Sequence, residues 1–141
     1  MSKDKNFWMC KAIDQAILGN SPFGAVIVNK EQDHIEAYNT TKHDGPVAHA
    51  EINVIQKLKY LDYNDASKLT LYSTVEPCPM CMSAIVWAGI GKVVYGASIE
   101  DASEFGHQIQ IRCKEVAQKS WYTIVIESAV EKERCLALFQ K

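Results

Sequence analysis

Apolar residues follow a helical spacing at the amino terminus and an extended spacing directly after it. The apolar positions of residues 4–18 are Phe7, Ala12, Ile13, Ala16 and Ile17. This spacing predicts an amphipathic helix, and Gly19 with Asn20 predicts its end. The apolar, β-branched run at 23–28 predicts a buried strand that pairs with 34–38. Because the connection between these two strands is short, they are predicted to be antiparallel.

The remaining pattern predicts strands that alternate with helices. The further strands are predicted at 69–75, 92–96 and 122–127, and the further helices at 79–88, 111–119 and 131–139. Another helix is predicted to begin at His49, with Ile52, Ile55, Leu58 and Leu61 on one face. The segments 39–48 and 98–110 are predicted to be irregular. This alternation indicates an α/β layer fold.

Composition and charge restrict the class of protein. The chain has 141 residues, which predicts one domain over residues 1–141. Its net charge is −2 and its pI is near 6.1. Nucleic-acid-binding domains are usually basic, so this charge argues against such a partner without excluding one. The charged segment 1–10 predicts no signal peptide, and no apolar run is long enough to span a membrane. We therefore expect a cytoplasmic protein.

Two short motifs carry the chemistry. His49 and Glu51 form an H-x-E motif, and Cys78 with Cys81 forms a P-C-x-x-C motif after Pro77. Together these motifs are the signature of zinc-dependent nucleobase deaminases. A catalytic zinc ion takes three protein ligands and keeps one position open. His49, Cys78 and Cys81 are the predicted ligands of one Zn²⁺ per chain, which leaves Glu51 free to transfer protons.

With these motifs, the sequence resembles the cytidine deaminase-like superfamily, in particular its branch of guanine and tRNA-adenosine deaminases. The resemblance is clearest over residues 23–95. It implies a three-layer α/β/α sandwich around a five-stranded mixed sheet, and a homodimer. In such a fold two helix amino termini would converge near Cys78 and favour its thiolate form. Hydrolysis would replace an exocyclic amino group and release ammonia.

The same resemblance suggests residues that bind the substrate. Asn39 matches an asparagine that hydrogen-bonds the base, and Ala50 lies between His49 and Glu51. Phe23 is predicted at the pocket wall, although a core position is an equal alternative. Trp87 matches a tryptophan of the guanine branch, with a buried structural role as its alternative.

Several alternatives stay open on sequence alone. The zinc site could be structural, Cys78 and Cys81 could form a redox pair, or the domain could bind without catalysis. The segment 98–106 is similar to the guanine branch, and the Lys-Thr-Gly-Ala-type loop of the tRNA branch is missing. However, His107 and Gln108 replace an acidic pair of the guanine branch. A guanine-like base or nucleoside is the favoured substrate, adenosine in tRNA is the second choice, and cytosine is a further alternative.

Overall fold

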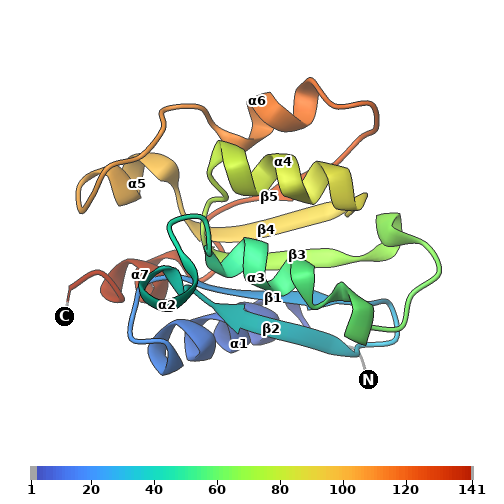
Figure 1. Ribbon diagram of the computed structural model, residues 1–141, viewed down its shortest axis with the longest axis horizontal. Coiled ribbons are helices and arrows are strands. Elements are labelled where there is room, and N and C mark those ends of the chain that lie inside the picture. The colour runs from blue at the N-terminus through green and yellow to red at the C-terminus, as the bar shows by residue number, and fades with distance from the viewer. Residues whose placement is uncertain (1–2, 141) are drawn as a thin grey trace.

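A mixed five-stranded sheet forms the centre of the computed structural model, which describes residues 3–140 (Figure 1). Its order is β2-β1-β3-β4-β5. The strands are β1 Gly24–Val28, β2 His34–Tyr38, β3 Thr70–Val75, β4 Lys92–Ala97 and β5 Val125–Glu127. Strand β1 pairs antiparallel with β2 and β3, whereas β3, β4 and β5 run parallel. The predicted five-stranded mixed sheet is therefore confirmed. Met1, Ser2 and Lys141 of the predicted domain lie outside the described residues.

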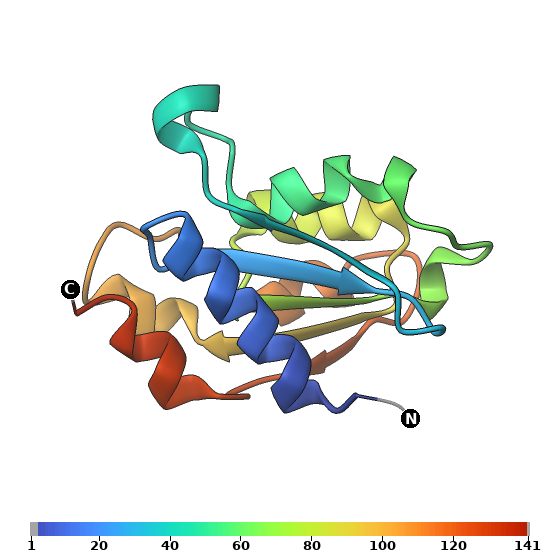
Figure 2. The same ribbon diagram turned by 90° about the horizontal axis from the view of Figure 1, so that it is seen from below.

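Helices cover both faces of this sheet, which confirms the predicted three-layer architecture. They are α1 Lys5–Leu18, α2 Thr41–Asp44, α3 Ala50–Gln56, α4 Pro79–Ala88, α5 Ile99–Ser103, α6 Cys113–Gln118 and α7 Lys132–Ala137, with 3₁₀ turns at Leu58–Tyr60 and Ala66–Lys68. Helices α1 and α7 pack on one face, and α3, α4 and α6 on the other (Figure 2). Within residues 3–140, no helix combines the length and the apolar character needed to cross a membrane.

The two faces of β1 show why its sequence is apolar at every position. Val26 and Val28 join the core cluster under α1, while Ala25 and Ile27 join the cluster under α3 and α4. All five residues of the strand are buried. A strand covered on both faces has no solvent side, so its pattern is a continuous apolar run rather than an alternation.

The parallel pairing of β3 with β4 determines where the site lies. Val75 is in register with Ala97, so the carboxyl ends of both strands lie at the same edge of the sheet. Helix α4 follows β3 after a short connection, and α5 follows β4. Connections at the carboxyl ends of parallel strands are the usual place for ligands in open α/β sheets.

The structure corrects the prediction for residues 39–61. The segment 39–48, predicted to be irregular, contains the short helix α2. The helix that begins after His49 ends at Gln56 and does not continue to Leu61. Of the predicted apolar face, Leu61 is buried, Ile55 and Leu58 pack partly buried against the core, and only Ile52 lies outside the core cluster. The prediction missed Ala50 and Val54, which are fully buried and form the centre of the face that α3 turns to the core.

Three further features differ from the prediction. The segment 98–110 contains helix α5. Strand β5 begins at Val125 rather than at residue 122. In α1 Ile17 is exposed, and Trp8 and Met9 contribute to the core instead.

Candidate metal centre

Two helix amino termini meet at the motif residues. His49 is the N-cap of α3 and Cys78 is the N-cap of α4, while Cys81 lies in the first turn of α4. His49 Nδ1 lies 3.8 Å from Cys78 Sγ and 3.5 Å from Cys81 Sγ. The expected convergence of two helix starts is therefore found.

These three side chains fit a zinc ion. With Zn–N of about 2.1 Å and Zn–S of about 2.3 Å, tetrahedral coordination requires ligand atoms roughly 3.5–3.8 Å apart. The two N–S distances of 3.8 and 3.5 Å lie in this range, and all three ligand atoms lie within 4.8 Å of one another. Among residues 3–140, no fourth His, Cys, Asp or Glu joins this group. A structural zinc site usually has four protein ligands, so this donor set is the one that a catalytic site needs.

The pKa values of the two thiols are shifted in opposite directions. The hydrogen bond from Cys81 lowers the pKa of Cys78 to about 4, and the same hydrogen bond raises the pKa of Cys81. The hydrogen bond with Cys78 also raises the pKa of His49. Cys78 is thus held as a thiolate, which is the form of cysteine that binds a metal ion.

Glu51 is a buried carboxyl group beside the three ligands. It lies in the first turn of α3 and is 5% exposed. Burial raises the pKa of Glu51 to about 7, because a charged carboxylate loses its hydration there. A pKa near neutrality is what a group needs in order to both accept and donate a proton at physiological pH.

Phe23 and Asn39 line one cavity of about 640 Å³, between the end of α1 and α2. The Asn39 side-chain oxygen accepts hydrogen bonds from the Thr41 backbone N–H at 3.0 Å and the Thr41 hydroxyl at 2.9 Å. The Asn39 backbone N–H in turn donates to the Phe23 carbonyl at 3.4 Å. Phe23 also packs against the core, in agreement with the alternative of a core position, and its place at the wall of a substrate pocket stays a prediction. Ala50, the first residue of α3, is fully buried in the core.

Trp87 lies apart from these residues. It is 78% exposed near the end of α4, so the alternative of a buried structural tryptophan is wrong. Its ring makes an edge contact with Trp121, with centroids 5.0 Å apart. These two rings line a shallow hollow between α4 and α6, distinct from the cavity that contains Asn39.

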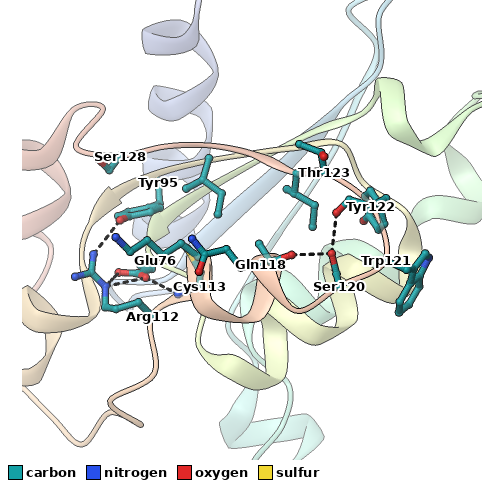
Figure 3. Close-up of a pocket in the computed structure, with 14 residues that line it drawn as sticks. Glu76, Tyr95, Arg112, Cys113, Gln118, Ser120, Trp121, Tyr122, Thr123 and Ser128 are labelled. Atoms are coloured by element: carbon teal, nitrogen blue, oxygen red, sulfur yellow. Dashed lines mark hydrogen bonds and ion pairs between the residues drawn. The ribbon is translucent and has the colours of Figure 1, made fainter.

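Sequence reasoning missed the surroundings of Glu76, the residue before Pro77. Its carboxylate is buried and accepts hydrogen bonds from Arg112, Ile99 and Cys113. Glu76, Arg112 and Tyr95 form one end of a cavity of about 790 Å³, between α6 and β4–β5 (Figure 3). The only sequence signal was an acidic residue directly after the predicted strand at 69–75.

Comparisons with known proteins agree with this geometry. The family model for the cytidine and deoxycytidylate deaminase zinc-binding region matches residues 2–97. The guanine deaminase of Bacillus subtilis is 41% identical over 110 residues, which cover 76% of this chain and 69% of that protein. A tRNA-specific adenosine deaminase of Buchnera aphidicola is 32% identical over 140 residues, which cover 94% of this chain and 83% of that protein.

A solved structure shows the same fold. The guanine deaminase from Nitrosomonas europaea superposes with a TM-score of 0.78, covering 99% of this chain and 85% of that chain. Its sequence is 20% identical. At this identity the likeness concerns the arrangement of helices and strands.

Proposed function

Because the chain belongs to the zinc-dependent cytidine and deoxycytidylate deaminase family, we propose that it deaminates a small purine base or nucleoside, with guanine as the favoured substrate. The reaction replaces a C–NH₂ group with a carbonyl group, protonates the neighbouring ring nitrogen and releases ammonia. We also propose that residues 1–141 act as one domain.

In this proposal His49, Cys78 and Cys81 hold the zinc ion. Zinc bound there supplies a Lewis acid that lowers the pKa of a water molecule from about 15.7 toward about 7. The thiolate charge of Cys78 favours metal binding, and the positive ends of α3 and α4 stabilise that charge. Phe23, Asn39, Ala50 and Trp87 remain the proposed substrate contacts.

Glu51 moves the protons. As a carboxylate it accepts a proton from the attacking water and donates it to a ring nitrogen next to the reacting carbon. It then transfers the second proton of the water to the amino group, which leaves as ammonia. Burial supports both steps, because it brings the pKa of Glu51 to about 7.

The observation that carries the choice of guanine is the 41% identity to a guanine deaminase over 76% of the chain. The test is ammonia release from a panel of guanine, guanosine, adenosine, cytosine and a tRNA anticodon stem-loop. We expect fast turnover of guanine or a close analogue. Turnover of the stem-loop alone would overturn the choice of substrate and leave the deaminase assignment intact.

The second candidate is a deaminase of adenosine in tRNA. It is favoured by the tRNA-specific relative, which matches 94% of this chain. The exposed lysine and histidine of α2, Lys42 and His43, lie beside the cavity that contains Asn39 and would meet a phosphate backbone. The same panel decides between the two candidates.

We further propose a cytoplasmic homodimer. Trp87 and Trp121 are large apolar side chains, both more than half exposed, that a second copy would cover. In such a dimer Trp87 would reach a substrate only across the interface between the two copies. Light scattering at micromolar concentration measures the mass, and a monomer would contradict the dimer.

A further inference from the structure

The Glu76 carboxylate joins three parts of the chain. It is 2% exposed and belongs to the connection between β3 and α4. Oε1 accepts a hydrogen bond from the backbone N–H of Ile99 at 3.0 Å, and Oε2 accepts one from the backbone N–H of Cys113 at 2.8 Å. Ile99 and Cys113 are the first residues of α5 and α6. One carboxylate therefore satisfies free amide groups at the starts of two helices that are distant in sequence.

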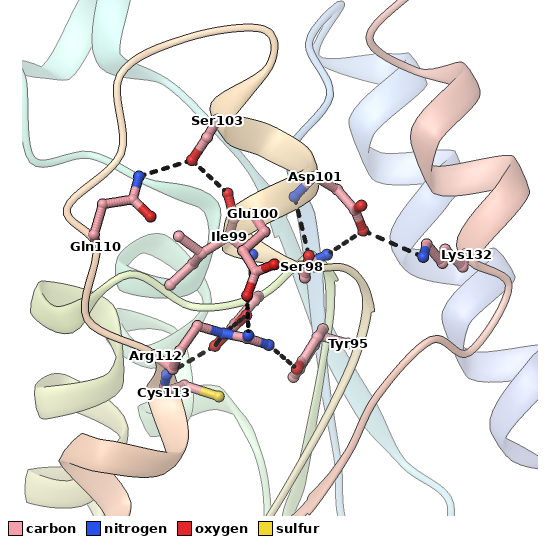
Figure 4. A network of polar contacts seen from close by, with 11 residues as sticks. Tyr95, Ser98, Ile99, Glu100, Asp101, Ser103, Gln110, Arg112, Cys113 and Lys132 are labelled. Carbon is pink, nitrogen blue, oxygen red and sulfur yellow. Dashed lines mark hydrogen bonds and ion pairs between the residues drawn. The ribbon is translucent and has the colours of Figure 1, made fainter.

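Arg112 completes this arrangement from the residue before α6. Its Nε donates to both carboxylate oxygens of Glu76, at 2.9 and 3.0 Å. Its two terminal nitrogens donate to Glu100 at 2.8 Å and to the Tyr95 hydroxyl at 3.1 Å (Figure 4). The guanidinium thus reaches β4, α5 and the β3–α4 connection at the same time. No other cation compensates the buried Glu76 charge among the described ion pairs.

Only Pro77 separates Glu76 from the ligand Cys78. The proline ring fixes its own φ angle, which removes one of the rotations between the anchored carboxylate residue and the thiol. On its other side, the Cys78 carbonyl accepts the first hydrogen bond of α4, from Met82 at 2.8 Å. The position of Cys78 is therefore restrained from both directions.

We propose that Arg112 and Glu76 are positioning residues that hold Cys78 and Cys81 in the geometry that binds zinc. This inference rests on the proposed function, since it needs these cysteines to be ligands. Arg112 touches neither the ligands nor the cavity that contains Asn39, and acts through Glu76. Outer partners of metal ligands commonly change metal affinity or activity by about 10–100-fold when they are replaced.

The test measures zinc release and cobalt spectra rather than turnover. Zinc-loaded wild type, Arg112→Ala and Glu76→Gln are mixed with an excess of a coloured chelator, and the release rate is followed. The same variants are loaded with Co²⁺, whose visible absorption reports the coordination geometry. We expect zinc release about 10–100-fold faster in both variants, with altered cobalt bands. Arg112→Lys keeps the charge but loses the planar fork, so it should lie between wild type and Arg112→Ala.

Two controls separate positioning from general stability. Glu100→Ala removes the exposed partner of Arg112 and leaves Glu76 untouched, so it should release zinc as wild type does. Val94→Ala weakens the core on the opposite face of the sheet, beneath α1, and should lower the unfolding temperature without changing zinc release or cobalt bands. The Arg112→Ala/Glu76→Gln double variant should be no worse than the more affected single variant, because the ion pair between Arg112 and Glu76 is already lost in each single variant.

The outcomes separate the two proposals. Release rates and cobalt bands equal to wild type in Arg112→Ala and Glu76→Gln would overturn the positioning role. Zinc retained in full by Cys78→Ala, or absent from wild type, would instead overturn the proposed metal site and this inference with it. If Arg112→Ala does not fold, Arg112→Lys decides: faster release supports the role, and a wild-type rate overturns it.

Discussion

At the scale of single residues, two acidic groups of the same site have their pKa values shifted in opposite directions, one by a hydrogen bond and the other by burial. The Cys78 thiol has its pKa lowered to about 4 by the hydrogen bond from Cys81, whereas burial raises the pKa of Glu51 to about 7. A thiolate suits a permanent ligand, and a carboxyl group near neutrality suits proton transfer. This division of roles leads to separable effects of substitution.

Replacing Glu51 should abolish turnover and keep the metal. We expect Glu51→Ala to retain about one zinc ion per chain, as a three-ligand site implies. Its ammonia release should fall by about 10²–10⁴-fold or more, the usual contribution of a general acid–base group. Elemental analysis and an ammonia assay measure the two effects, with Glu133→Gln, an exposed glutamate of α7, as the matched control. Loss of zinc from Glu51→Ala would show that Glu51 is itself a ligand.

The sequence predicted the metal ligands because their signature is local, but it missed the partners of Glu76. Cys78 and Cys81 belong to one short motif, and His49 to another. Arg112 is 36 residues from Glu76, and no spacing rule connects such distant residues. The orientation of Trp87 was also beyond prediction, since α4 is apolar at nearly every position and its pattern does not show which side faces the core.

At the scale of secondary-structure elements, α5 is marked in the sequence by its capping residues and not by the spacing of its apolar residues. Ser98 caps the helix by accepting from the Asp101 backbone N–H at 3.0 Å, and the Asp101 carboxylate accepts from the Ser98 backbone N–H at 3.0 Å. This capping box stabilises a helix of five residues, which is too short for an apolar period to be recognised. A search for S-x-x-D would have found α5 within the segment predicted to be irregular.

The capping box should make stability depend on pH. The hydrogen bond from the Ser98 backbone lowers the pKa of Asp101, so the folded protein binds this proton less tightly than the unfolded chain does. The stabilisation is therefore fully present above the ordinary carboxyl pKa of about 3.9, and it is lost as pH falls through the lower folded value. Asp101→Asn should lower the free energy of unfolding by about 0.5–1 kcal/mol at pH 7 and by less near pH 3.

Urea unfolding of wild type and Asp101→Asn at both pH values measures this difference. Protonation of the metal ligands affects both proteins equally and cancels in the comparison. Ser98→Ala is the matched variant, because it removes the other half of the box and keeps the carboxylate. An equal cost of Asp101→Asn at both pH values would contradict a contribution from the charge.

The contact of α1 with β1 requires the absence of a side chain at Gly24. A Cβ atom there would lie 2.0 Å from the Ala12 carbonyl oxygen and 2.6 Å from the Ala16 nitrogen. Both are backbone atoms, so relief requires α1 to move away from the sheet. Gly24→Ala should lower the free energy of unfolding by about 2–3 kcal/mol, in the upper part of the usual range for overpacking. Gly106→Ala, where a Cβ meets nothing within 4 Å, is the control in the same urea titration.

At the scale of the whole molecule, the fold does not distinguish the two candidate substrates, because guanine and tRNA deaminases both appear among the relatives. The charge of the protein and of each substrate distinguishes them more sharply. The net charge is −2. Guanine is uncharged at neutral pH, so its capture needs no basic surface. A tRNA stem-loop is bound through phosphate contacts that displace counterions, and each contact makes the affinity fall further with salt.

We therefore expect kcat/KM for guanine to change little between 50 and 200 mM salt. For an enzyme that makes about 6–10 phosphate contacts with its substrate, the same increase in salt would lower the affinity by about 10³–10⁵-fold. No change in protein stability would produce this effect. Lys42→Ala, on the protruding helix α2, is the matched variant. This variant should leave guanine turnover unchanged. It would weaken the dependence of kcat/KM on salt concentration only if a nucleic acid were the substrate. A steep fall of kcat/KM with salt concentration that Lys42→Ala reduces would change the assigned substrate from a free base to tRNA. The zinc site and Glu51 would keep their proposed roles.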